Sequence, residues 1–286
     1  MKIVTDSGTD TRCLNTDNYE IHEVSLKVNI GDATYLDGQG TDLGLFYETM
    51  ETSEVLPKTS QPSAGEFAEL YRKLAKKDKD ILSIHISSGL SGTVNSALAA
   101  AEMVPEANVT VVDTKTLSVG SGWQVMEAAK AITAGWTKEQ IVPYLKRIAD
   151  ATRTIYTLKE LKFLINGGRI SHMKGLLASI LNIKPLIGVD NVKGNYTQMG
   201  QSRSFKLALQ GLVNLIGKTV STDEKIVAQV VHADNFEGAE LLRSQIESKF
   251  QAIWHPACQL SLVLGAHTGS SLVGICYAPA SVFEGL

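Results

Sequence analysis

Short apolar runs alternate with longer segments whose apolar residues recur at helical spacing along the first half of this 286-residue chain. The apolar runs predict buried strands at residues 2–5, 81–86 and 109–112. The helical spacing predicts helices at residues 43–50, 64–77, 93–103, 123–134 and 138–150. Strands that alternate with helices in this way indicate β-α-β units around a mainly parallel sheet.

The pattern changes in the second half of the chain. A strand is predicted at residues 153–157 and a short helix at 158–165, which ends at the break Asn166-Gly167-Gly168. Two apolar segments, 184–189 and 195–199, flank a polar turn and predict a hairpin. The remaining predicted elements are strands at 225–231, 260–264 and 272–277 and a helix at 237–250.

We therefore expect an α/β protein of two domains. Residues 1–153 are expected to form an N-terminal β-α-β domain with a mainly parallel sheet, and residues 154–286 a C-terminal α/β domain with a mixed or antiparallel sheet. No linker rich in Pro, Gly or Ser separates the halves, so a large interface is expected between them. Because clefts between domains often hold ligands, we expect a ligand in this interdomain cleft.

The composition argues against two classes of partner. The chain has 27 basic and 30 acidic residues, a net charge of −3 and no long Lys/Arg run, which disfavours nucleic acid and an anionic membrane surface. No apolar stretch approaches the roughly 18 residues that a membrane span needs. The chain opens on a strand rather than a signal peptide, so we expect a cytoplasmic protein without stable membrane insertion.

The cysteines and histidines predict neither a disulfide nor a metal site. Cys13, Cys258 and Cys276 are odd in number, far apart and without metal-ligand spacing, which favours buried, reduced thiols. The six histidines share no metal-ligand spacing either, and we expect no metal. His85 lies inside a predicted strand and is expected to be a core residue.

Two hydroxyl-rich segments predict a site for an anionic group. They are Thr59-Ser60-Gln61-Pro62-Ser63 and Ser87-Ser88-Gly89-Leu90-Ser91-Gly92-Thr93, and each stands where a loop leads into a helix. The free N–H groups and the positive dipole of a helix start favour a phosphate or a carboxylate there. Helix capping and local turn bonds are the alternative roles for Ser91 and Thr59. Neutral hydroxyls suit a carboxylate attached to a bulky apolar group.

Three other polar residues are candidates of a weaker kind. His267 follows a predicted strand in a loop of small residues that lets a ligand approach, although a lone histidine is more often a surface or satisfied residue. Asp6 and Ser7 follow the first strand, at the edge where sites lie in α/β sheets. A structural loop also explains these two residues, so they are secondary candidates.

Two enzyme classes compete with a binding role. Ser91 and His267, with an aspartate, would make a serine hydrolase or esterase for a lipid-like ester, although Ser91 lacks the Gly-x-Ser-x-Gly context. A nucleotide-using enzyme would need a phosphate-binding glycine motif. The chain has no Gly-x-x-x-x-Gly-Lys-Ser/Thr segment and no Gly-x-Gly-x-x-Gly segment after the first strand.

Five segments together resemble the DegV family. They are Asp6-Ser7, the two hydroxyl-rich segments, Leu161-Lys162-Phe163-Leu164-Ile165-Asn166-Gly167-Gly168-Arg169-Ile170 and Gly265-Ala266-His267-Thr268-Gly269, in this order over essentially the whole chain. The resemblance implies a bacterial fatty-acid-binding protein without catalytic activity, the carrier subunit of a fatty acid kinase. A separate ATP-dependent kinase subunit would convert the bound acid to an acyl phosphate for phospholipid synthesis. The last segment departs from the family pattern, since Thr268-Gly269-Ser270 stands where Gly-Pro-Gly is expected.

The resemblance also implies roles for individual residues. The residues implied to bind the fatty-acid carboxylate are Thr59, Ser60, Ser91, Gly92, Thr93 and His267. Arg169 and, more weakly, Arg203 would dock the kinase or contact the phosphate, with a surface ion pair as the alternative for Arg169. No cofactor is implied, and a monomer is the default expectation.

The acyl tail would supply most of the affinity. Each buried methylene contributes about 0.8 kcal/mol, so a C16–C18 tail offers on the order of 12 kcal/mol before ordering and association costs. The C-terminal domain is expected to form much of the acyl tunnel, along residues 158–164, 173–186 and 226–231. A helix at residues 176–181 is expected to form one tunnel wall.

Overall fold

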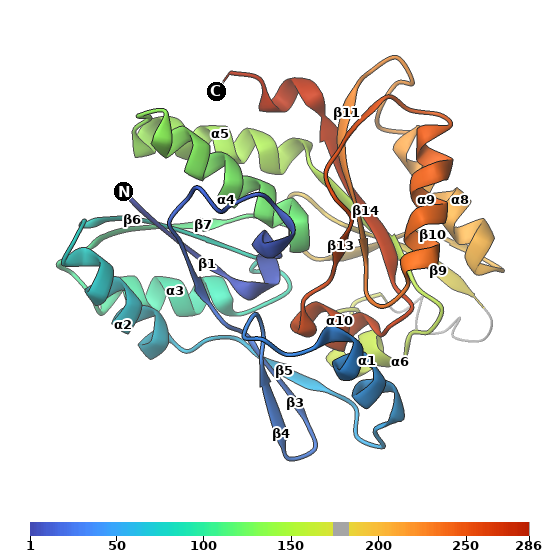
Figure 1. Cartoon of the computed structure of the whole chain (residues 1–286), viewed down its shortest axis with the longest axis horizontal. Coiled ribbons are helices and arrows are strands. Elements are labelled where there is room, and N and C mark those ends of the chain that lie inside the picture. The colour runs from blue at the N-terminus through green and yellow to red at the C-terminus, as the bar shows by residue number, and fades with distance from the viewer. Residues whose placement is uncertain (174–182, 286) are drawn as a thin grey trace.

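The N-terminal part of the chain is built on a four-stranded parallel sheet. A computed structural model describes residues 1–173 and 183–285 (Figure 1). The strand order is β2-β1-β6-β7, and every pairing is parallel. The strands are β1 (Lys2–Asp6), β2 (Ile21–Val24), β6 (Asp80–His85) and β7 (Asn108–Asp113). The three strands predicted from the apolar runs are therefore confirmed, and β2 adds an edge to them.

Helices cover both faces of this parallel sheet (Figure 1). They are α2 (Ala64–Ala75), α3 (Thr93–Glu102), α4 (Ser118–Thr133) and α5 (Lys138–Ala151). α4 and α5 pack against Ile3 and Ile84 on one face, and α2 and α3 pack against Val4 and Ile81 on the opposite face. Strand residues alternate between the two faces, so an uninterrupted apolar run is needed when helices cover both.

A smaller antiparallel sheet extends from the N-terminal half, and the hydrophobic pattern did not predict it. Its order is β4-β3-β5. The strands are β3 (Lys27–Ile30), β4 (Ala33–Leu36) and β5 (Lys58–Ser60), and α1 (Leu43–Thr52) connects the last two. Gly31, with a φ of 57°, forms the turn between β3 and β4. This conformation favours glycine because the residue has no Cβ.

The C-terminal part is built on a seven-stranded mixed sheet. The main order is β10-β9-β8-β14-β11-β12, and β13 also pairs with β11. β11 pairs in parallel with β12 and β13, whereas the other pairings are antiparallel. The strands are β8 (Arg153–Thr157), β9 (Lys184–Val189), β10 (Tyr196–Ser202), β11 (Ile226–His232), β12 (Ala252–Trp254), β13 (Cys258–Gln259) and β14 (Val273–Pro279). The predicted hairpin is confirmed as β9 and β10.

The two sheets are joined by an apolar core. Helices α8 (Phe205–Ile216) and α9 (Phe236–Glu247) pack on one face of the mixed sheet (Figure 1). A core cluster then combines Leu117 and Trp123 from the N-terminal half with Tyr156 and Ile187 of the mixed sheet. A parallel sheet followed by a mixed sheet confirms the expected α/β fold class. The domain boundary proposed between residues 153 and 154 falls at the start of β8.

One predicted strand is wrong. Residues 260–264 lead into a helix, α10 (Leu262–Thr268), which follows the short strand β13. Residues 260–264, which are four apolar residues and Ser261, fit a buried strand and a buried helix equally well, so periodicity alone could not separate them. His267 consequently lies in the last turn of a helix, not in a loop.

The expectation of three reduced thiols is also wrong. Cys13 and Cys258 form a disulfide, with their Cα atoms 5.4 Å apart. The fold brings the helical turn Thr11–Cys13 beside β13, and the sequence separation of 245 residues hides this proximity. Cys276 remains a buried free thiol, and burial raises its pKa to about 12.

The structure describes the expected acyl-tunnel walls only in part. Residues 158–164 and 226–231 contribute buried apolar side chains such as Leu158, Leu164 and Val231. The helix predicted at residues 176–181 and part of the wall predicted at 173–186 lie outside the described residues.

Among the helices of the described residues, none is both long enough and apolar enough to cross a membrane.

Candidate functional site

The site lies where the small antiparallel sheet meets α10. Thr59 is the middle residue of β5, and His267 lies near the C-terminal end of α10. Thr59 Oγ1 and His267 Nε2 are 2.7 Å apart and share a hydrogen bond, although 208 positions separate the two residues. β5 pairs Thr59 with the buried Val28 of β3, so the strand register fixes where the hydroxyl stands.

Protein closely surrounds the imidazole of His267. Gly167 ends helix α6 (Lys162–Gly167), and a Cβ at this position would lie 2.2 Å from His267 Nδ1. Only glycine allows so close an approach. Burial and the neighbouring Arg169 guanidinium lower the pKa of His267 from 6.5 to about 3. The ring is therefore neutral near pH 7, with one nitrogen as donor and the other as acceptor.

The second hydroxyl-rich segment forms the start of α3. Ser91 Oγ lies 2.8 Å from Thr93 Oγ1, and the Thr93 N–H donates to Ser91 Oγ at 3.4 Å. Gly92 is the N-cap residue between them. A Cβ on Gly92 would lie 2.5 Å from the side-chain nitrogen of Gln61, so the two hydroxyl-rich segments meet here.

Arg169 joins the α6 turn to the segment before α3. Its Nη1 donates to the carbonyl of Gly167 at 2.6 Å, and its Nε donates to the carbonyl of Leu90 at 3.2 Å. The side chain is half-buried. These bonds to neutral carbonyls leave the positive charge of Arg169 beside His267, where an anion would be attracted.

A cavity of about 30 Å³ lies among these residues. Its polar lining is Thr59, Ser60, Gln61, Ser91, Arg169, Tyr196 and His267, and its apolar lining is Leu26, Ile86, Leu90, Leu117, Val263 and Leu264. All of the apolar residues belong to the core cluster between the two sheets, and Tyr196 belongs to it as well. A polar head group could therefore bind here with an apolar chain directed into the core.

Comparisons with known proteins show what this chain is similar to. A family model described as an uncharacterised protein of the DegV family matches residues 1–280. The chain belongs to the DegV family. A DegV domain-containing protein of Staphylococcus aureus is 33% identical over 273 residues, which are 96% of each chain.

Two solved DegV structures share the whole fold. The fatty acid binding protein DegV of Bacillus subtilis has a TM-score of 0.87 and 29% identity, with 97% of this chain and 98% of that chain covered. A fatty acid binding DegV family protein of Thermus thermophilus has a TM-score of 0.85 and 29% identity, with 97% and 99% covered. The likeness extends over both sheets.

The fold brings most of the predicted DegV site residues to one place. The cavity lining contains Thr59, Ser60, Ser91, Arg169 and His267. Gly92 and Thr93 adjoin it at the start of α3. Arg203 is exposed just after β10 and does not line the cavity.

Asp6 and Ser7 have structural partners instead. The Asp6 carboxylate accepts the Ile86 N–H at 3.1 Å and lies 2.9 Å from His85 Nδ1, with both side chains fully buried. Ser7 Oγ accepts the N–H of Leu26 at 3.0 Å. These contacts fit the structural-loop alternative, and His85 is the core residue that the sequence predicted.

The geometry does not support the hydrolase alternative. His267 Nε2 is bonded to Thr59, and Ser91 Oγ is bonded to Thr93, so no hydrogen bond joins Ser91 to His267 in the described structure. A serine nucleophile is activated by such a bond. Gly167 stands against Nδ1, the atom to which the carboxylate of a triad would bond.

Two cavity residues, Gln61 and Tyr196, were not predicted as site residues from the sequence. Gln61 lies inside the first hydroxyl-rich segment, so its position along the chain was a usable signal. Tyr196 pairs with Val189 across the hairpin and packs edge-on against Tyr156, with ring centroids 5.5 Å apart. Burial raises the pKa of Tyr196 to about 12. No local motif marks this tyrosine, because only the tertiary fold places it at the cavity.

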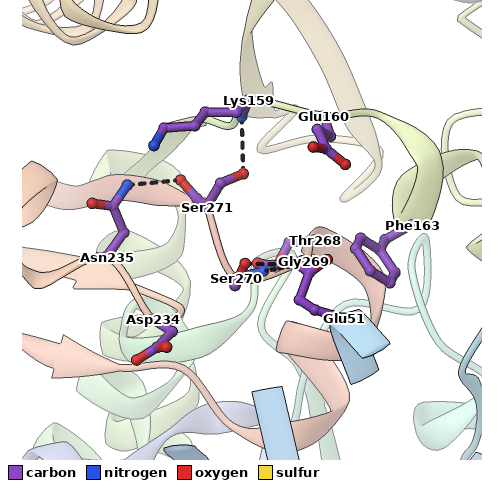
Figure 2. Close-up of a pocket in the computed structure, with 10 residues that line it drawn as sticks. All are labelled: Glu51, Lys159, Glu160, Phe163, Asp234, Asn235, Thr268, Gly269, Ser270 and Ser271. Atoms are coloured by element: carbon purple, nitrogen blue, oxygen red, sulfur yellow. Dashed lines mark hydrogen bonds between the residues drawn. The ribbon is translucent and has the colours of Figure 1, made fainter. Parts of the chain in front are cut away.

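A second cavity, of about 250 Å³, lies beside the segment that follows α10 (Figure 2). Ser270 Oγ donates to Glu51 at 2.7 Å, and the backbone N–H of Lys159 donates to Ser271 Oγ at 3.0 Å. Asn235 Nδ2 donates to the Ser271 carbonyl at 3.0 Å. These bonds lie within the wall, whereas Figure 2 draws the charged ends of Lys159, Glu160 and Asp234 without a hydrogen bond to another lining residue.

Proposed function

We propose that this chain binds a long-chain fatty acid, with the carboxylate near Thr59, Ser91 and His267 and the tail in the apolar core. The observation that carries the proposal is the Thr59–His267 hydrogen bond in a cavity whose apolar walls belong to that core. The DegV proteins of Bacillus subtilis and Thermus thermophilus, both 29% identical to this chain, bind fatty acids.

The polar groups of the cavity suit a carboxylate. When His267 Nε2–H donates to Thr59 Oγ1, the Thr59 hydroxyl is free to donate to a carboxylate, and the Ser91 hydroxyl is a second donor. Arg169 supplies a positive charge, and a charge-assisted hydrogen bond is stronger than a neutral one. We infer that this set orients the carboxylate and leaves one oxygen accessible for reaction.

The cavity must enlarge to admit an acyl tail. Its volume of about 30 Å³ is about a tenth of the smallest ordinary ligand pockets, which span roughly 300–1,000 Å³. The apolar side chains of the core cluster, such as Leu90, Leu117 and Leu264, would have to separate. We propose that residues 1–153 and 154–286 form the two walls that part. Burial of the tail, at about 0.8 kcal/mol per methylene, would offset the cost.

We further infer a carrier role for the bound acid. The resemblance to DegV carrier subunits supports a separate ATP-dependent kinase as partner, with this chain non-catalytic and acting in the cytoplasm. Arg169 lines the cavity and could contact the incoming phosphate, whereas the exposed Arg203 could contact the kinase itself. These two arginines would then act at different steps.

Mass spectrometry of the purified protein tests the binding role directly. Native spectra should show a complex, and denaturing spectra should release about one C16–C18 fatty acid per chain. A protein that is empty and also fails to take up added hexadecanoic acid would contradict fatty-acid binding. Adding ATP and a DegV-partner kinase to the loaded protein should yield acyl phosphate, and acyl phosphate formed with ATP but no kinase would contradict the non-catalytic role.

A further inference from the structure

Two buried carboxylates from distant parts of the chain hold the start of α10. Asp10 Oδ1 accepts the backbone N–H of Ser261 at 3.0 Å, and Asp37 Oδ1 accepts the backbone N–H of Leu262 at 2.9 Å. All four residues are at most 2% exposed. The first N–H groups of a helix have no partner inside it, so these carboxylates supply bonds that buried groups need.

The N-cap side chain of α10 does not cap its own helix. Ser261 is the N-cap residue of α10, yet its side chain makes no capping bond, and its buried hydroxyl oxygen finds no partner among the described residues. A serine N-cap ordinarily accepts an N–H from the first turn of its own helix. The capping function therefore rests on Asp10 and Asp37, although burial raises the pKa of both carboxyl groups.

Asp10 is itself held firmly in place. Arg12 Nη1 lies 3.0 Å from Asp10 Oδ1, and Ser118 Oγ donates to Asp10 Oδ2 at 2.6 Å. Arg12 Nη2 donates to the carbonyl of Gln259 at 2.8 Å. The disulfide between Cys13, which follows Arg12, and Cys258, which precedes Gln259, joins these two segments covalently. The chain around residue 10 is thus attached at several points to the chain that leads into α10.

The opposite end of α10 carries His267. Leu262 and His267 are five residues apart, which is about 8 Å along a helix, so α10 transmits a displacement of its start to the imidazole. α10 also packs against α1, α6, β3 and β5. We propose that Asp10 and Asp37 are positioning residues, which hold α10 so that His267 meets Thr59; the role in fatty-acid binding rests on the proposed function of that site.

The first test observes His267 in the ligand-free protein. Nitrogen-15 NMR of the imidazole, assigned by comparison with His267→Gln and followed from about pH 8 down to about pH 3, should show a ring that stays neutral until the pH approaches 3 in the unaltered protein. In Asp37→Ala the helix start loses an acceptor, and we expect the His267 titration midpoint to rise by about one pH unit or more. Asp37→Asn keeps an acceptor oxygen and should restore the original behaviour.

A matched variant separates this effect from general destabilisation. Asp42 caps the neighbouring helix α1 by accepting the Leu45 N–H at 2.9 Å, but it is exposed. Asp42→Ala should lower the melting temperature without changing the His267 titration. Should Asp37→Ala not fold, Arg12→Met removes a partner of Asp10 from an exposed position and should shift His267 in the same direction. An unchanged His267 signal in a folded Asp37→Ala or Arg12→Met protein would overturn the proposal.

The second test compares two ligands with the same tail. We expect Asp37→Ala to weaken hexadecanoic acid binding about tenfold and hexadecanol binding less than about twofold, because only the acid uses the carboxylate site. Equal weakening of both ligands would indicate a merely structural role and contradict positioning. If the unaltered protein binds neither ligand, the proposed fatty-acid function fails, whereas the NMR result still decides whether Asp37 positions His267.

Discussion

Thr59 and His267 are 208 positions apart in the chain, and their side chains approach to 2.7 Å, one from a strand of the small antiparallel sheet and the other from α10. The pairing of β5 with β3 fixes the position of the Thr59 side chain, and α10 fixes the position of the His267 side chain. The pair therefore reports whether the N-terminal and C-terminal parts of the molecule are correctly assembled. It also supplies the most direct test of the head-group site.

Replacing Thr59 by Val should weaken fatty-acid binding about five- to tenfold, because the variant keeps the shape and loses one hydrogen bond worth about 1 kcal/mol. Isothermal titration with hexadecanoic acid measures the change. Thr34→Val is the matched control, since Thr34 lies on the same small sheet and its exposed hydroxyl donates to Asn29 at 2.7 Å. Equal affinities for the two variants would remove Thr59 from the site.

Replacing Ser91 by Ala should reduce carboxylate binding, and with it acyl-phosphate formation in the presence of kinase, without unfolding the protein. The expected loss is roughly tenfold for one direct hydrogen bond to a charged group. Ser88→Ala is the control from the same turn, because the Ser88 hydroxyl donates to Asp113 and does not line the cavity. Normal yield of acyl phosphate from Ser91→Ala would exclude Ser91 from the mechanism.

Replacing Arg169 by Met should weaken hexadecanoic acid binding at least tenfold and leave hexadecanol binding within about twofold, since the lost interaction is with a charge. Fluorescence competition with both ligands gives the comparison. Arg203→Met should leave both affinities unchanged, because Arg203 is exposed and outside the cavity lining. Intact acid binding together with impaired kinase turnover in Arg169→Met would instead place Arg169 at the docking step.

The depressed pKa of His267 should be visible in the pH dependence of stability. Its folded pKa is about 3 and its ordinary value 6.5, so only the unfolded chain takes up this proton between those values. The contribution of His267 is therefore fully present above pH 6.5 and declines as the pH falls toward 3. In His267→Gln, urea unfolding should show a shallower loss of stability across this window.

Two buried carboxyl groups change the stability in the opposite direction with pH, and their contributions cancel when His267→Gln is compared with the unaltered protein. Burial raises the pKa of Asp37 to about 6 and that of Glu23 to about 7. Each of these carboxyl groups holds its proton longer when folded, so its contribution falls as the pH rises through that range. Both are present with and without His267. Parallel stability curves for His267→Gln and the unaltered protein would contradict the depressed pKa.

The local part of the site could be predicted because its signals are local. Ser91, Gly92 and Thr93 stand between a buried strand and a helix, and hydroxyls with glycine at such a junction indicate capping or anion binding whatever the rest of the fold does. Thr59 stands before another helix start, and its segment was found by the same rule. The hairpin of β9 and β10 was marked by the polar turn between two apolar runs.

The features that could not be predicted from the sequence depend on tertiary contacts or on short elements. The start of α10 is capped by Asp10 and Asp37, more than 220 residues away. The local signal is Ser261, which stands inside the segment 260–264 and does not by itself distinguish a strand from a helix start. The hairpin of β3 and β4 has only four residues on each strand, and the Gly31-Asp32 turn was its usable signal. Cys13 and Cys258 become neighbours only when β13 pairs with β11.

Removing the disulfide should destabilise the protein without abolishing the fold. A disulfide typically contributes roughly 2–4 kcal/mol, mainly by restricting the unfolded chain. Cys13→Ser should therefore lower the free energy of unfolding by this amount in urea titrations. Reductant should lower the stability of the unaltered protein to the same level and leave Cys13→Ser unchanged, because Cys276 is unpaired and buried. A reductant effect of equal size in both proteins would show that the Cys13–Cys258 bond is not its origin.

Since this bond joins the segments that lead to Asp10 and to α10, the His267 signal should broaden or shift in the same variant.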